Sequence, residues 1–95
     1  MKGVNQLKRP SDIIIDDFTD INLRTVVHVP IIVVCKNTSD YPGKYTARLW
    51  DIHKKPTRFV LVKEKIEEIR RCIPPHMARF EPESIDDPVI VETWI

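Results

Sequence analysis

The chain has 95 residues with a formal net charge of +1; 42% of its residues are hydrophobic and 31% are charged. This length supports one small domain with a single core, and the composition is not that of a disordered chain. The longest apolar run, Val29 to Cys35, falls far short of the roughly 20 residues that a membrane span needs, and no signal-peptide pattern begins the sequence. We therefore expect a cytoplasmic protein that does not contact membranes.

The first 30 residues form no clear periodic pattern, and we predict that residues 1–30 are a partly ordered N-terminal arm. Residues 31–95 should form a single α+β domain. The domain opens with "IIVVC" at 31–35, an apolar, mostly β-branched run typical of a strand covered on both faces. We expect this strand at the centre of the sheet.

A hairpin is predicted next. Turn-forming residues fill 37–43, and Pro42-Gly43 suits the middle of a type II turn because glycine accepts a positive φ. The alternation in 45–52 predicts a second strand, and "HKKPT" returns the chain into a third strand over 58–62, antiparallel to the second.

A short helix should follow, because Val62, Ile66, Ile69 and Ile73 lie on one helical stripe that Pro74-Pro75 ends. The last eight residues, "PVIVETWI", predict a closing strand. A right-handed crossover through the helix would place this strand beside "IIVVC" and parallel to it. The predicted fold is thus a β-β-β-α-β small mixed sheet with one helix packed on one face.

Charge is distributed unevenly along the chain. Residues 31–75 carry ten basic and five acidic side chains, whereas residues 76–95 carry one basic and five acidic. The two blocks can neutralise each other within the fold, or the basic block can face a partner of opposite charge. The candidate partner-binding residues on the hairpin are Lys44, Arg48, Trp50, His53, Lys54, Lys55 and Arg58.

Three interpretations of the hairpin stay open. Its basic residues are simply a solvated turn, or they bind an acidic protein surface, or they track a nucleic-acid backbone with Trp50 and Tyr45 as stacking platforms. The overall pI near 7.8 and the acidic tail favour a protein over a nucleic acid. A strand that ends in Trp94-Ile95 also makes a homodimer a candidate assembly.

No catalytic motif is found. Only two glycines are present, which excludes phosphate loops and dinucleotide fingerprints, and neither the cysteines nor the histidines have metal-ligand spacing. A metal-dependent nuclease would need carboxylates to converge, and the candidates are Asp51, Asp86, Asp87 and Glu92. We expect no enzyme activity, no cofactor and no bound metal.

The pieces "DYPG", "ARLWD" and "DDPVIVETW" resemble small uncharacterised proteins encoded in phages and prophages of Gram-positive bacteria. This resemblance implies an accessory phage protein that acts inside the host cell. More distantly, three strands followed by "EEIRRCI" are similar to the sheet-helix unit of HicB-family antitoxins, although their glycine and threonine positions between sheet and helix are missing here.

The sequence therefore predicts a non-enzymatic binding module that occupies a host protein with an acidic surface, as an inhibitor of a defence or regulatory function. The alternative is a nucleic-acid-binding or antitoxin-like regulator that uses the same hairpin.

Overall fold

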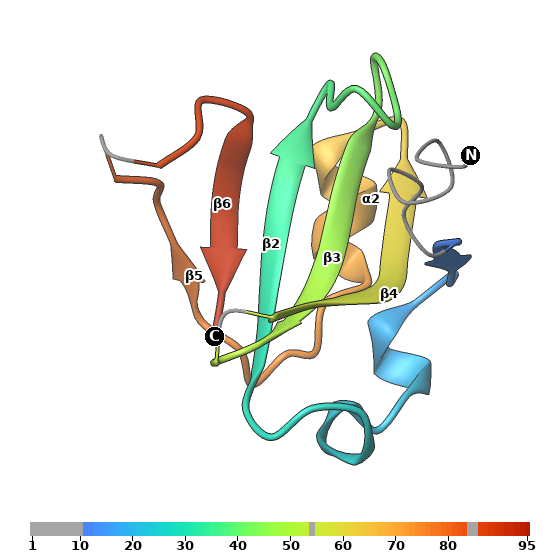
Figure 1. Ribbon diagram of the computed structural model, residues 1–95, viewed down its shortest axis with the longest axis vertical. Helices are drawn as coiled ribbons and strands as arrows, with labels where there is room; N and C mark the ends of the chain where they lie inside the picture. The colour runs from blue at the N-terminus through green and yellow to red at the C-terminus, as the bar shows by residue number, and fades with distance from the viewer. Residues whose placement is uncertain (1–10, 54, 84–85) are drawn as a thin grey trace, which may run out of the picture.

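The computed structural model describes residues 11–53, 55–83 and 86–95, which form a six-stranded sheet and one α-helix (Figure 1). The strands lie in the order β1-β4-β3-β2-β6-β5. The pairing of β1 with β4 is parallel and the other pairings are antiparallel, so the predicted α+β class with a small mixed sheet is confirmed. The elements are β1 (Ile13–Ile14), the 3-10 helices η1 (Phe18–Asp20) and η2 (Leu23–Thr25), β2 (Pro30–Lys36), β3 (Tyr45–Asp51), β4 (Lys55–Lys63), α2 (Ile66–Arg71), β5 (Arg79–Phe80) and β6 (Ile90–Trp94).

β2 lies inside the sheet, as its apolar run predicts, and pairs antiparallel with both β3 and β6. Its side chains alternate between two unlike environments. Ile32 and Val34 are fully buried on the side of α2, whereas Ile31, Val33 and Cys35 on the other side are only half-buried. The expectation that both faces of this strand are equally covered is therefore wrong: one of its apolar faces is left partly open.

The predicted hairpin is confirmed, with β3 and β4 paired antiparallel from Tyr45↔Lys63 to Asp51↔Lys55. The pairing is irregular between Arg48 and Trp50. At the turn before β3, Gly43 has a φ of 75°, which lies in the left-handed region that glycine adopts without a steric penalty.

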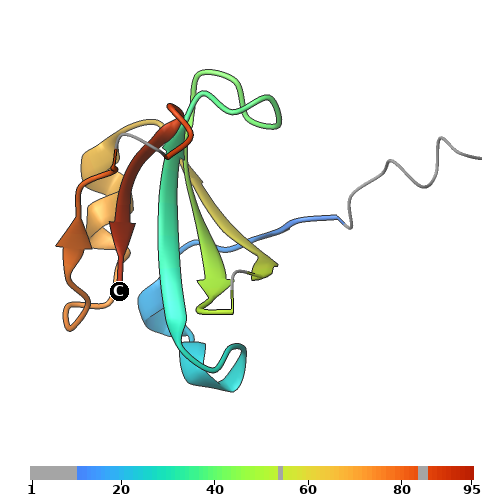
Figure 2. The same ribbon diagram turned by 60° about the vertical axis from the view of Figure 1, so that its left-hand side comes forward.

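α2 covers one face of the sheet (Figure 2). It begins at Ile66, later than the predicted stripe, because Val62 belongs to β4. Ile69 and Ile73 are buried against the sheet. Acidic residues occupy its first turn and basic residues its last turn, which is the order that the helix dipole favours.

The closing strand β6 lies beside β2, as predicted, but it runs antiparallel to β2 rather than parallel. The reason is the short strand β5, which precedes β6 and pairs with it antiparallel. β5 therefore runs in the direction of β2, as a crossover requires, and β6 then returns between the two. With only two residues, β5 leaves no periodic signal in the sequence.

The described part of the predicted arm joins the same core as the rest of the chain. Phe18, Leu23 and Val27 are buried in one cluster with Ile32 and Ile69. β1 adds a parallel strand to the edge of β4. Residues 11–30 therefore pack with residues 31–95 around one core. Residues 1–10 of the predicted arm lie outside the described residues.

Candidate functional site

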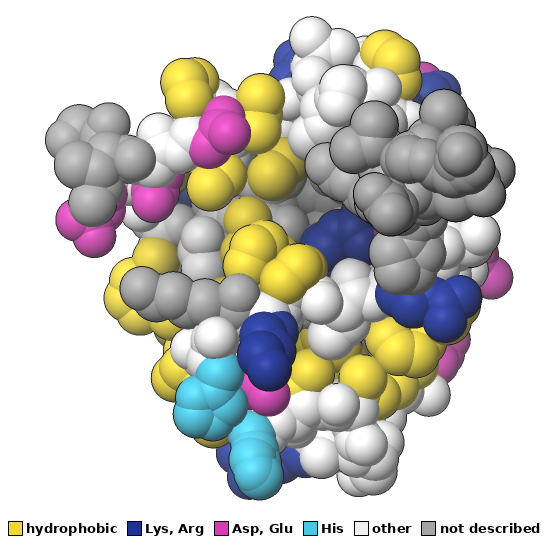
Figure 3. All heavy atoms as spheres, viewed as in Figure 1, with side chains coloured by type: hydrophobic (Ala, Val, Ile, Leu, Met, Phe, Trp, Pro, Cys, Tyr) yellow, Lys and Arg dark blue, Asp and Glu magenta, His cyan; other side chains and the backbone are white. Residues whose placement is uncertain are grey.

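The face of the sheet opposite α2, called the open face below, is formed by Val33, Cys35, Thr46, Trp50 and Ile90. Within the described ranges, no helix packs on it. It carries a hollow of about 510 Å³, which residues of β2, β3 and 87–90 line, with the loop 37–41 at one end. Figure 3 shows this side of the molecule, where hydrophobic side chains gather over β2 and β6 next to basic ones.

The period of two along β3 explains which aromatic side chain reaches this face. Tyr45, Ala47 and Leu49 contribute to the core on the helix side, so Thr46, Arg48 and Trp50 point the other way. The second tryptophan, Trp94, lies on the helix side, where its Nε1 donates a hydrogen bond of 2.8 Å to Glu92. Trp50 is thus the tryptophan available to a partner.

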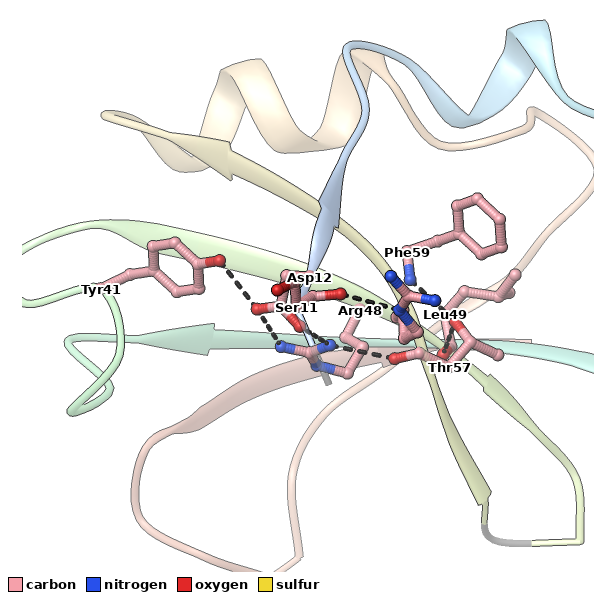
Figure 4. Close-up of polar contacts among 8 residues, drawn as sticks. Ser11, Asp12, Tyr41, Arg48, Leu49, Thr57 and Phe59 are labelled. Carbon is pink, nitrogen blue, oxygen red and sulfur yellow. Dashed lines mark hydrogen bonds and ion pairs between the residues drawn. The ribbon is translucent and has the colours of Figure 1, made fainter. Parts of the chain in front are cut away.

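Arg48 is at the centre of a polar cluster beside the hollow (Figure 4). Its Nη1 and Nη2 donate to Oδ1 and Oδ2 of Asp12 at 2.8 and 2.9 Å, a bidentate pair. Nη1 also donates to the carbonyl oxygen of Thr57 at 2.9 Å, and the Tyr41 hydroxyl donates to Asp12 Oδ2 at 2.7 Å. From the described residues, the Asp12 carboxylate therefore receives three hydrogen bonds, which two side chains donate.

These contacts shift the acid-base equilibria of the donors. The hydrogen bond from Arg48 to Asp12 raises the pKa of Arg48, although partial burial opposes the shift. Burial, together with the hydrogen bond to Asp12, raises the pKa of Tyr41. Both donors therefore keep their protons at neutral pH, as a guanidinium and a neutral phenol that face Asp12.

The structure divides five of the seven predicted partner-binding residues into engaged and exposed groups, while Trp50 lines the hollow. Lys44 pairs with Glu64, Arg48 pairs with Asp12, and Arg58 Nε donates to the carbonyl oxygen of Ser11 at 2.7 Å. His53 and Lys55 are exposed at the hairpin end, while Lys54 lies outside the described residues.

The hairpin end lies next to Trp50. Trp50 is paired with Pro56 in the register of β3 and β4, immediately before the residues that form the turn. The His53 ring meets the His28 ring edge-on, with 6.3 Å between the ring centroids. The exposed end of the hairpin is therefore continuous with the open face.

Sequence reasoning missed Asp12, Tyr41 and Thr57. Asp12 lies 36 positions from Arg48, and no local pattern links the two residues. Cys35 also lines the hollow, where burial and the nearby Asp87 raise its pKa.

The carboxylates considered for a nuclease do not converge. Glu92 is buried on the helix side, where it accepts from Arg70 and Trp94, whereas Asp87 lines the hollow on the open face. Asp86 and Asp87 accept hydrogen bonds from the backbone N–H groups of Glu83 and Val89, close to them in the chain before β6. In the part of the chain that is described, no group of three His, Cys, Asp or Glu residues could hold a metal ion.

None of the helices in the described ranges is long and apolar enough to cross a bilayer. A scan against models of protein families, a search of curated proteins and a search of solved structures each found no match for this chain.

Proposed function

We propose that this chain is a non-enzymatic binding module of phage or prophage origin, which occupies a host protein through its open face and the adjoining end of the hairpin. The observation that carries the proposal is the half-buried apolar surface around Trp50 on the uncovered side of the sheet. Removing apolar side chains such as Val33 and Ile90 from water is favourable, and no helix in the described chain covers them.

The chemistry of this surface suits a protein partner. Tryptophan is among the residues that most often dominate binding energy at protein interfaces. The exposed His53 and Lys55 at the hairpin end, next to the open face, favour a partner with acidic groups near the apolar contact. A nucleic-acid-binding or antitoxin-like role has less support, because the overall pI is near 7.8 and the last 20 residues are acidic.

The test compares capture from a Gram-positive host lysate by the wild-type chain, by Trp50→Ala and by Arg71→Ala. Arg71 is exposed on α2, on the opposite side of the sheet, and serves as the matched control. We expect one partner that wild type and Arg71→Ala capture and Trp50→Ala loses. With the purified partner, Trp50→Ala should weaken the affinity by about 30-fold, as for a hot-spot residue worth about 2 kcal/mol.

Capture that Trp50→Ala leaves unchanged would exclude the open face as the contact. A bound species that is removed by nuclease treatment, and whose affinity falls steeply with salt, would instead favour the nucleic-acid alternative.

A further inference from the structure

The polar cluster around Arg48 binds a carboxylate of the chain itself, that of Asp12. Arg48 and Tyr41 together direct three hydrogen-bond donors at both oxygens of Asp12, at 2.7 to 2.9 Å. The side chains of Arg48 and Asp12 are about four-fifths buried, at 21% and 18% exposure. A guanidinium group matches the two oxygens of a carboxylate in a bidentate pair of this kind, which a lysine ammonium cannot form.

Residues 11–14, which include Asp12, have only a short backbone pairing with the sheet in the described structure. β1 has only two residues, and its pairing with β4 covers Ile13↔Phe59 and Ile14↔Val60, with a further bond from Ile15 N–H to the Val60 carbonyl oxygen at 3.0 Å. Ile14 is 60% exposed, so β1 buries little apolar surface. Among the described residues, the polar contacts of Ser11 and Asp12 therefore add to this short backbone pairing in fixing the segment on this edge.

Ser11 and Asp12 also engage two arginines on the partner side of the molecule. Arg48 donates to the Asp12 carboxylate, and Arg58 Nε donates to the Ser11 carbonyl oxygen. Both arginines lie next to the open face or its edge, where a partner with acidic groups would meet them. Such a partner finds the cationic groups occupied by residues of this chain.

We infer that Arg48, Tyr41 and the adjoining edge of β4 bind an extended acidic and apolar segment of the partner protein, and that residues 11–14 occupy this receptor until the partner displaces them. The inference rests on the proposed function and specifies the chemistry of the partner. An exchange of one carboxylate for another leaves no buried charge unpaired, and an extended segment can add to the β4 edge as β1 does.

The test uses the full chain with the internal carboxylate removed. In ¹⁵N-labelled Asp12→Ala, the amide signals of Phe59 and Val60 are followed as a synthetic peptide with the sequence SDIIID, residues 11–16 of this chain, is added. The matched control peptide is SNIIID, which keeps shape and apolar content but has an amide in place of the first carboxylate. We expect the SDIIID peptide to bind at least tenfold more tightly than SNIIID.

Two further proteins complete the design. Wild type should bind SDIIID at least tenfold more weakly than Asp12→Ala, because a tethered competitor acts at an effective concentration in the millimolar range. Arg48→Lys in the Asp12→Ala background should lose the preference for SDIIID, since lysine cannot form the bidentate pair. Asp12→Asn, which retains a polar side chain of the same size, replaces Asp12→Ala if the alanine variant does not give a folded spectrum.

Equal binding of the two peptides, or binding of neither, would overturn the receptor. No host protein takes part in this experiment, so its failure would leave Trp50-dependent capture standing. Conversely, a loss of the capture result would leave the measured peptide preference intact, and the two conclusions can therefore fail separately.

Discussion

Glu92 is a carboxylate buried on the helix side of the sheet, with its side chain 1% exposed. It accepts a hydrogen bond of 2.8 Å from Arg70 Nη2 and another of 2.8 Å from Trp94 Nε1. Burial raises the pKa of Glu92, but the hydrogen bonds from Arg70 and Trp94 outweigh burial, so the pKa lies below its ordinary value of 4.5. The ion pair between Arg70 and Glu92 also links the basic segment 31–75 to the acidic segment 76–95.

The lowered pKa of Glu92 predicts how its contribution to stability depends on pH. A carboxyl whose pKa is lower in the folded state stabilises the fold above its unfolded pKa, and the contribution is lost as the pH falls through the folded value. Glu92→Gln should therefore reduce the free energy of unfolding at pH 7 by about 2 kcal/mol, the scale of hydrogen bonds to a charged group. The difference from wild type should shrink as the pH drops below 4.5.

Denaturant unfolding at pH 7 and pH 3 checks this expectation, with the exposed Glu83→Gln as the control. A loss of stability in Glu92→Gln that is the same at both pH values would show that the second acceptor oxygen, rather than the charge of Glu92, is what the core requires.

At the scale of elements, long periodic segments could be predicted from the sequence and short ones could not. The β2 strand, the hairpin and the helix carry patterns of several residues, and the apolar run of β2 also indicates its interior position. β1 and β5 have two residues each, too few for any period, so the parallel pairing of β1 with β4 could not be predicted and the predicted direction of β6 was wrong.

The candidate site could also be predicted only in part from the sequence, for a different reason. Trp50 could be placed on a mixed face of β3 by alternation alone. The partners of Arg48 could not, because Asp12 and Tyr41 meet it only after the edge strand and the loop before β3 are in place. Lys44 and Arg48 form ion pairs with residues distant in the sequence, and these pairs could not be predicted from the local pattern of basic residues.

The turn between β2 and β3 gives a prediction for this element. Gly43 has a φ of 75°, and a Cβ added there would meet no atom within 4 Å, so only the backbone conformation disfavours a side chain. The Gly43 N–H also donates to Asn37 Oδ1 at 2.7 Å, which fixes the loop in this conformation. Gly43→Ala should therefore lower the free energy of unfolding by about 1 kcal/mol.

Denaturant unfolding measures the cost, with Ser39→Ala in the same loop as the control, since Ser39 is exposed. No loss of stability in Gly43→Ala would mean that the turn can change its conformation without disturbing the pairing of β2 with β3.

At the scale of the whole molecule, the sheet separates two unlike surfaces. The core cluster, with Phe18, Ile69 and Met77, fills the helix side, while the hollow with Trp50 lies on the other. A small domain depends on one core for its stability, so side chains on the open face should contribute less to folding than those under the helix. This asymmetry is what leaves the open face available for binding.

Val33 and Val34 test this asymmetry, because they are the same residue type, adjacent in β2, and point to opposite sides of the sheet. Val34→Ala removes methyl groups from a fully buried site and should lower the free energy of unfolding by about 2 kcal/mol, including the cost of the cavity. Val33→Ala, at a half-buried site beside the hollow, should cost less than about 1 kcal/mol. Urea unfolding of both variants at two protein concentrations tenfold apart measures the difference. If Val33→Ala and Val34→Ala cost the same free energy at both concentrations, the face at Val33 is not uncovered. A cost for Val33→Ala that falls on dilution would show that a second copy of the chain covers the open face.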